Sequence, residues 1–313
     1  MPPTASAGAR ATIDAAATIP QLPRPVVVGG LVVGVAAVSS AAVLIRLAEA
    51  HPLAIAYWRC LGGAAALAPF ALRARRGAPR LDRAQRWQIT GAGLFLALHF
   101  ALWIGSLELT TVASSVTLVT TAPLFVGIGA TLLLDEAPAR STWLGMAITV
   151  AGALTIGLAD LSDVTLGRRA LFGDVMALGG AVAVTGYLLA GRAARRRLPL
   201  TVYATGVYAV GAAALLAASM AAGVQLGGYD RGTWLALAAL IVGPQLLGHT
   251  VFNGLLSTVT ATVLSVVVLA EPVGATLLAW LVLGELPAGL FWVGAPMILA
   301  GVWVATSRWD ART

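Results

Sequence analysis

The chain has 313 residues, of which 59% are hydrophobic and 11% are charged. Its mean hydropathy of +0.89 excludes an ordinary water-soluble domain and predicts an all-α integral membrane protein. The formal charge is +7, but the arginines that supply it fall mostly between apolar runs rather than in one patch, so we expect no nucleic-acid partner. Cys60 is the only cysteine, which excludes an internal disulfide, and with three histidines we expect neither a metal site nor another cofactor.

The first segment, residues 1–25, is rich in Ala, Thr and Pro and is predicted to be a disordered cytoplasmic tail. The sequence Ala48-Glu49-Ala50 resembles a signal-peptide cleavage site. However, the apolar run over 26–45 is longer than a signal-peptide core, and Arg46 interrupts the approach to that site. We therefore expect a retained first transmembrane helix.

Apolar runs long enough to cross a membrane recur along the whole chain. A spanning helix needs about 20 apolar residues, and its backbone must satisfy its own hydrogen bonds in lipid. Ten runs are predicted as spans: 26–48, 52–72, 87–107, 112–134, 141–159, 172–190, 200–222, 233–256, 259–284 and 288–306. Arginines concentrate in the 2–3 and 6–7 loops, which places both termini in the cytoplasm of a cell whose plasma (inner) membrane holds the protein.

An internal repeat relates the two halves of the chain. Between positions 130 and 152, ten of 23 residues are identical to the residue 149 positions later, including Glu136 with Glu285 and Trp143 with Trp292. Coincidence in an Ala- and Leu-rich chain explains the Ala and Leu matches, but not Glu, Pro and Trp in step. A unit of five spans enters the membrane the other way up when it is repeated, so we predict two inverted five-helix repeats, 26–159 and 172–307. Inverted repeats are the construction of secondary transporters.

The same residues resemble a known family. The ten-span layout, "RC" at Arg59-Cys60, and "LAEPVGATLLAWLVLGELPAGLFWVGAPMILAGV" over 269–302 are similar to EamA-type members of the drug/metabolite transporter superfamily. The resemblance implies an exporter-like carrier for small metabolites with a central cavity between two EamA repeats. The aromatic amino acid exporters are one candidate likeness within the superfamily, although no motif singles them out.

Glu271 is the first candidate for chemistry, because an ionisable group inside a membrane is costly and is often functional. It lies about 18 Å along its span, near the midplane, and Pro272 beside it removes a backbone hydrogen bond and kinks the helix. Such an acid could bind a substrate amine, a cation or a transported proton. The alternative is a structural glutamate that pairs with another helix. The first half has Ala122 at the matching position, so the repeat itself does not require the acid.

Two helix faces at the same depth carry polar and aromatic side chains at i, i+4 and i+8, which is the spacing of one face. They predict the wall of a mixed cavity, and the alternative is interhelical hydrogen bonding and packing. The faces are Phe95, His99 and Trp103 in span 3, and Gln245, His249 and Asn253 in span 8. Tyr187 and Ser40 are weaker additions to the translocation path, and Pro123, Pro244 and Pro272 are the predicted kink or gating positions.

Two arginines near membrane ends are candidate charge partners. Arg46 and Arg59 could reach the outer headgroups or bind a carboxylate, but an ion pair with Glu49 or Glu108 is the simpler expectation. Glu136 and Glu285 end equivalent helices and are predicted to be turn residues at the gates rather than substrate contacts.

Together these features predict a secondary transporter for a small organic solute. The chain has no P-loop and no lysine, so the driving force must be the solute gradient or a coupled ion, with Glu271 and His99 as proton sites and uniport as the alternative. Amino acids such as aromatic or hydrophobic ones are the best guess, and drugs, cations or nucleosides are alternatives. Export is the expected direction.

An intramembrane enzyme is not expected, because H-E-x-x-H and G-x-S-x-G are absent from the sequence. The partners are the solute and the bilayer, and the sequence does not separate a monomer from a homodimer.

Overall fold

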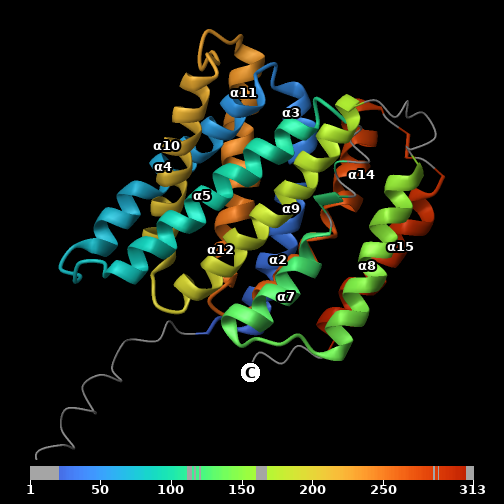
Figure 1. Cartoon of the computed structure of the whole chain (residues 1–313), viewed down its shortest axis with the longest axis horizontal. Coiled ribbons are helices and arrows are strands. Elements are labelled where there is room, and N and C mark those ends of the chain that lie inside the picture. The colour runs from blue at the N-terminus through green and yellow to red at the C-terminus, as the bar shows by residue number, and fades with distance from the viewer. Residues whose placement is uncertain are drawn as a thin grey trace, which may run out of the picture.

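The computed structural model describes residues 21–110, 115, 118–119, 121–159, 168–284, 286–287 and 289–307. Within these ranges the regular structure is entirely helical (Figure 1). The predicted tail lies outside the described residues up to position 20, and the first described helix begins at Arg24, before the predicted boundary of 26. Glu285 also lies outside them.

Helices of the first half follow the predicted apolar runs. They are α2 (Arg24–Ser39), α3 (Ala41–Leu47), α4 (Pro52–Arg75), α5 (Arg83–Ser106), α7 (Ala122–Leu134) and α8 (Arg140–Ala159). The start of α5 is fixed by a capping box, in which Asp82 Oδ1 accepts from Gln85 N at 2.7 Å and Gln85 Oε1 accepts from Asp82 N at 3.1 Å.

Helices of the second half include one π-helical segment. They are α9 (Arg168–Arg195), α10 (Leu200–Ala221), α11 (Arg231–Leu240), the π-helix η2 (Ile241–Thr250), α12 (Val251–Leu255), α13 (Ala261–Val268), α14 (Glu271–Leu283) and α15 (Phe291–Thr306). Three of the predicted runs are irregular, although each remains one helical stretch: the first changes at Ser40, the eighth contains η2, and the ninth changes between α13 and α14.

The interruption before α14 has a direct cause in the sequence. Pro272 has no N–H to donate to the carbonyl of Val268, so α13 ends at Val268 and a new helix starts at Glu271 with proline in its first turn. In the first half, α7 likewise begins at Ala122 with Pro123 in its first turn.

The repeat extends to backbone conformation. Both α7 and α14 have 13 residues, and their first residues, Ala122 and Glu271, are 149 positions apart. Each helix ends in a left-handed residue, Asp135 with φ of 55° and Gly284 with φ of 72°. Aspartate is among the few residue types that tolerate this conformation, which explains how two different residues end equivalent helices.

The contacts between the two halves follow the same repeat. When both helices of a contact are replaced by their equivalents 149 positions away, the result is another contact in the structure. The packing of α5 on α9 corresponds to that of η2 on α2, and the packing of α7 on α9 corresponds to that of α14 on α2. The pairs α4 with α10 and α8 with α15 each join a helix to its own equivalent. The halves therefore interlock rather than pack as two separate bundles.

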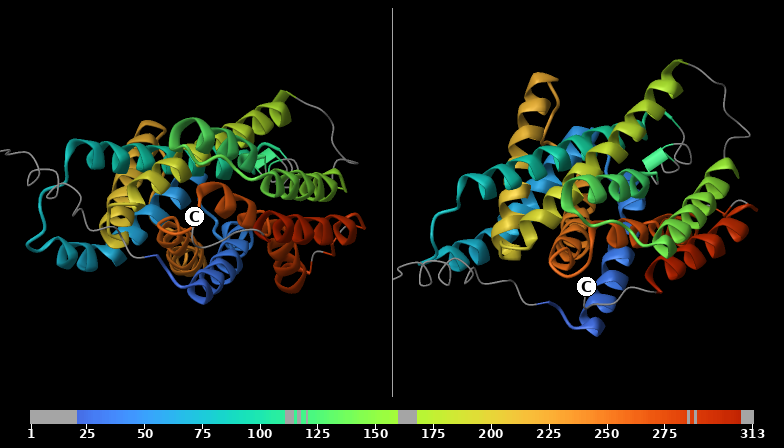
Figure 2. Two further views of the ribbon diagram at one scale, coloured as in Figure 1. Left: turned by 90° about the horizontal axis from the view of Figure 1, so that it is seen from below. Right: turned by 60° about the horizontal axis from the view of Figure 1, so that its bottom comes forward.

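The pair α8 and α15 stands at one side of the molecule, and the further views show the two helices running side by side (Figures 1 and 2). Glycines allow their backbones to touch: a Cβ atom built on Gly145 would lie 2.5 Å from the carbonyl oxygen of Gly301, and one on Gly152 would lie 2.7 Å from that of Gly294. Such small-residue crossings are common between helices in membranes.

Among the described residues, seven helical stretches are long and apolar enough to cross a membrane. They are Arg24–Leu47, Pro52–Arg75, Arg83–Ser106, Arg168–Arg195, Leu200–Ala221, Arg231–Leu255 and Ala261–Val282, with Ala122–Leu134 and Phe291–Thr306 as shorter apolar helices. The chain is a multi-pass membrane protein by these measures.

Candidate functional site

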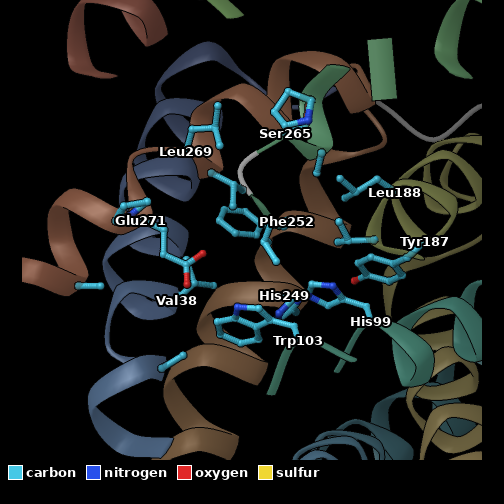
Figure 3. A pocket seen from close by; sticks show the side chains of 18 of the residues that line it. Val38, His99, Trp103, Tyr187, Leu188, His249, Phe252, Ser265, Leu269 and Glu271 are labelled. Carbon is cyan, nitrogen blue, oxygen red and sulfur yellow. The ribbon is translucent and has the colours of Figure 1, made fainter. Parts of the chain in front are cut away.

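A cavity lies where the helices of the two halves meet (Figure 3). The cavity has a volume of about 130 Å³. Side chains from α2, α3, α4, α5, α7, α9, η2, α12, α13 and α14 line it, so both halves contribute. The wall is mainly apolar, with a few ionisable and hydrogen-bonding groups, as in many small-molecule sites.

The cavity wall follows the internal repeat. Five pairs of lining residues are related by the 149-position shift: Val38 and Tyr187, Trp103 and Phe252, Val119 and Val268, Ala122 and Glu271, Pro123 and Pro272. Both halves therefore contribute equivalent positions to the cavity wall.

The predicted face of α5 reaches the cavity through two of its three residues. The rings of His99 and Trp103 are stacked, with centroids 5.9 Å apart and planes 3° apart. His99 Nδ1 donates to the carbonyl oxygen of Gly180 on α9 at 2.9 Å, because a carbonyl can only accept. Phe95 is 41% exposed and is not in the cavity wall.

Only one of the three residues of the predicted face of span 8 lies in the cavity wall. His249 lines the cavity, with its ring against those of Phe100 at 5.2 Å and Tyr187 at 6.1 Å. Gln245 and Asn253 are fully buried away from it. The reason is η2: its i→i+5 pattern turns the side chains away from the i+4 register on which the prediction depended.

Asn253 instead belongs to a chain of buried hydrogen bonds. Its Oδ1 accepts from the Tyr187 hydroxyl at 2.8 Å, and its Nδ2 donates to the Tyr208 hydroxyl at 3.3 Å. The Tyr208 hydroxyl also lies 2.9 Å from the Thr250 hydroxyl. Tyr187 lines the cavity, so this chain fixes one cavity residue from behind.

Arg59 lies in the cavity wall and not at the membrane surface. It is 1% exposed, and its guanidinium carbon lies 4.2 Å from the centroid of the Phe100 ring. Nε and Nη1 have no hydrogen-bond partner among the described residues. The expected ion pair with Glu49 or Glu108 is wrong for Arg59, because both acids are exposed while Arg59 is buried in the bundle.

Glu271 is the acidic group in the cavity wall. Its carboxylate points toward the space between Trp103 and Phe252 (Figure 3). Its backbone carbonyl accepts from the Ser39 hydroxyl at 3.3 Å, which ties the start of α14 to α2. No hydrogen bond to the carboxylate is found within the described ranges, but Glu271 and Arg59 are close enough to interact electrostatically.

The other predicted positions are divided between the cavity and its surroundings. Pro123 and Pro272 line the cavity, whereas Pro244 is buried within η2. Ser40 donates to the carbonyl of Ala37 at 2.7 Å and lies outside the lining, and Arg46 is exposed on α3.

A second polar cluster closes around Glu136, beyond the end of α7. Arg192 and Arg196 both form ion pairs with it, and the Arg192 Nη1 donates to the carbonyl of Leu256 at 2.8 Å. Arg195 Nε donates to the carbonyl of Asn253 at 2.8 Å. The sequence predicted Glu136 as a turn residue but did not identify its arginine partners, because loop arginines were interpreted only as topology signals.

Comparisons of the sequence with known proteins identify a transporter family. The model of the family described as "EamA-like transporter family" matches residues 26–158 and 171–307. An "Uncharacterized transporter" of Archaeoglobus fulgidus is 27% identical over 277 residues, which cover 88% of this chain and 94% of that protein. A solved structure described as "Crystal structure of protein" has a TM-score of 0.74 at 22% identity, covers 91% of this chain and 98% of its own, and shares the fold.

Proposed function

Because this chain belongs to the EamA-like transporter family, we propose that it is a secondary carrier that moves a small organic solute by alternating access between two inverted repeats. The observation that carries this proposal is the cavity wall, in which five residue pairs are related by the 149-position repeat. A site on the axis between equivalent halves can be opened to either side by exchanging the conformations of those halves.

The proposed topology has ten spans as two five-helix repeats, 26–159 and 172–307, with both termini in the cytoplasm and the plasma (inner) membrane as location. The family model's two matches and the exchanged helix contacts support the repeats. In a Cys60→Ser background, a cysteine at Arg80 between α4 and α5 should react with a membrane-impermeant maleimide only after permeabilisation. Labelling in intact cells would show that this loop lies outside and that the topology is the opposite of the one proposed.

The proposed solutes are amino acids with aromatic or hydrophobic side chains, moved outward. The rings of Trp103, His99 and Phe252 offer apolar surface, while Arg59 and Glu271 offer charges that can orient a polar end. Cationic drugs and nucleosides are the alternative solutes. Cationic drugs and nucleosides have larger ring systems and different charges from these amino acids, so one transport screen can distinguish the three classes of solute.

The driving force is proposed to be the solute gradient or a coupled proton. In a proton-coupled cycle, Glu271 and His99 are the cavity groups that can exchange a proton. In uniport, neither would change its protonation during the cycle.

The direct experiment uses protein purified and reconstituted into liposomes loaded with unlabelled solute. We expect saturable counterflow of labelled hydrophobic amino acids, and much weaker counterflow of nucleosides and cationic drugs. Absence of saturable flux for every class would refute the carrier, and flux that rises without saturation would indicate a channel.

A further inference from the structure

Two opposite charges line the cavity, and their symmetry equivalents are uncharged. Arg59 corresponds to Tyr208 and Glu271 corresponds to Ala122 under the 149-position shift. The apolar part of the wall is therefore shared by the two halves, whereas one half supplies the cation and the other supplies the anion. A solute in this cavity meets a charge of each sign.

The guanidinium of Arg59 needs an anion. It is buried in the bundle, two of its nitrogens have no hydrogen-bond partner among the described residues, and the Phe100 ring covers it at 4.2 Å. A ring face attracts a cation, but it provides no oxygen acceptor for the hydrogen bonds that a guanidinium normally donates. A carboxylate matches its planar, forked donors better than any neutral group does.

The carboxylate of Glu271 needs a cation, and it has no hydrogen bond within the described ranges although it points into the cavity (Figure 3). Arg59 interacts with it electrostatically but forms no ion pair with it at contact distance in the part of the chain that the structure describes. Both groups therefore remain available to a ligand rather than being satisfied by each other.

We propose that the solute is a zwitterion whose carboxylate is bound by Arg59 and whose ammonium group is bound by Glu271, with its apolar side chain between Trp103 and Phe252. A zwitterion leaves the net charge of the cavity unchanged. A purely anionic or purely cationic solute would add one uncompensated charge to an apolar wall, which is costly.

This assignment rests on the proposed carrier function and adds the charge pattern of its solute. It also predicts the orientation of the solute: the carboxylate faces α4 and the ammonium group faces α14. Because equivalent positions in the other half are uncharged, the orientation stays fixed to the same helices as the two halves exchange conformation.

The test uses three probes that share a phenyl ring: L-phenylalanine, 2-phenylethylamine and 3-phenylpropionate. Binding to purified wild-type protein is measured by calorimetry. We expect L-phenylalanine to bind at least about tenfold more tightly than either singly charged probe, since each charge-assisted pair is worth at least that factor.

The variants should change the two preferences separately. In Arg59→Gln, the advantage of L-phenylalanine over 2-phenylethylamine should disappear, while its advantage over 3-phenylpropionate remains. In Glu271→Gln, the reverse should occur. Arg73→Gln on the same α4 helix and Glu108→Gln, both exposed in the structure, are the matched controls and should keep both preferences.

Folding is checked for each variant by elution profile and unfolding temperature, and Arg59→Lys provides a variant that keeps the charge. Arg59→Lys should bind L-phenylalanine more weakly than wild type but retain its preference over 2-phenylethylamine. An equal weakening of all three probes in Arg59→Gln would make Arg59 structural and overturn the assignment.

Two further outcomes separate this assignment from the carrier itself. If counterflow is found for another solute class while none of the three probes binds, the zwitterion assignment fails and the carrier stands. If no solute shows counterflow, the proposed function fails first.

Discussion

Arg192 Nε donates a hydrogen bond to Glu136 Oε1 at 2.8 Å, and Arg192 Nη2 lies at 2.8 Å from the same oxygen. The third nitrogen of the guanidinium donates to the carbonyl of Leu256. One side chain of α9 thus joins the segment after α7 to the segment after α12. With the proposed topology the end of α7 faces the cytoplasm, so this cluster lies on the cytoplasmic side.

Arg192→Ala should destabilise the folded protein. The two side chains are only 10% and 14% exposed, so removing the arginine leaves a nearly buried carboxylate without its main partner, at a cost of about 1–3 kcal/mol. Unfolding in detergent should show that loss. Arg192→Lys keeps the charge but not the forked geometry and should lose less. If Arg192→Ala and Glu136→Gln were fully additive in the double variant, the two residues would not be coupled.

Gly145→Ala should weaken the packing of α8 on α15. A Cβ atom at this position would lie 2.5 Å from the Gly301 carbonyl oxygen and 2.7 Å from the Ala305 Cα, so backbone atoms would have to move. We expect a loss of about 1–3 kcal/mol in the free energy of unfolding. Gly91→Ala on α5 is the matched control, because among the described residues nothing beyond its own helix backbone lies within 4 Å of its Cβ position. Equal stability of the two variants would show that α8 and α15 leave room for a methyl group at Gly145.

The stability of α11 should depend on pH through Asp230. This aspartate caps the helix by accepting from the backbone N–H groups of Gly232 and Thr233, each at 2.9 Å, and hydrogen bonds from Thr233 and Gly232 hold its pKa below the ordinary value. A lowered pKa means that its contribution is complete above the unfolded-state pKa of about 3.9 and is lost as pH falls through the folded-state pKa.

Unfolding temperatures measured from neutral to acidic pH should therefore show a decline in wild-type protein that is smaller in Asp230→Asn. Asparagine also caps helices but does not titrate in this range. Identical acid profiles for the two proteins would exclude the cap as the source of this dependence.

Glu271→Gln should reduce transport and remove the part of its pH dependence that a coupled proton causes. The substitution keeps the size of the side chain and takes away both its charge and its titratable proton. Flux into liposomes is compared with and without an imposed pH gradient, with Glu108→Gln as the control at an exposed acid. If the variant responds to the gradient as wild type does, the coupling site lies elsewhere or the coupled ion is not a proton.

The sequence predicted the positions of the helices well because lipid requires long apolar runs, and runs are visible in a single chain. It also located much of the cavity wall: His99, Trp103 and Glu271 were found by depth and spacing. Gln245 and Asn253 lie outside the wall, because a π-helical segment changes the side-chain register without a clear sequence signal beyond Pro244.

Arg59 was assigned to the wrong environment for a different reason. Its depth in the span allowed either a lipid-facing or an inward direction, and a single sequence does not fix the rotation of a helix. Phe252, in contrast, could have been predicted, because it stands 149 positions after Trp103. Applying the repeat shift to every candidate residue would have identified it.

The cavity between the halves is the proposed path of the solute. Ala275 on α14 lines this cavity, whereas Ala213 on α10 is exposed on the outside of the bundle. The measurement is counterflow of labelled L-phenylalanine into liposomes containing wild-type, Ala275→Trp or Ala213→Trp protein. We expect saturable counterflow for wild type and Ala213→Trp, and its loss in Ala275→Trp. Undiminished counterflow with the cavity filled by tryptophan would contradict this path.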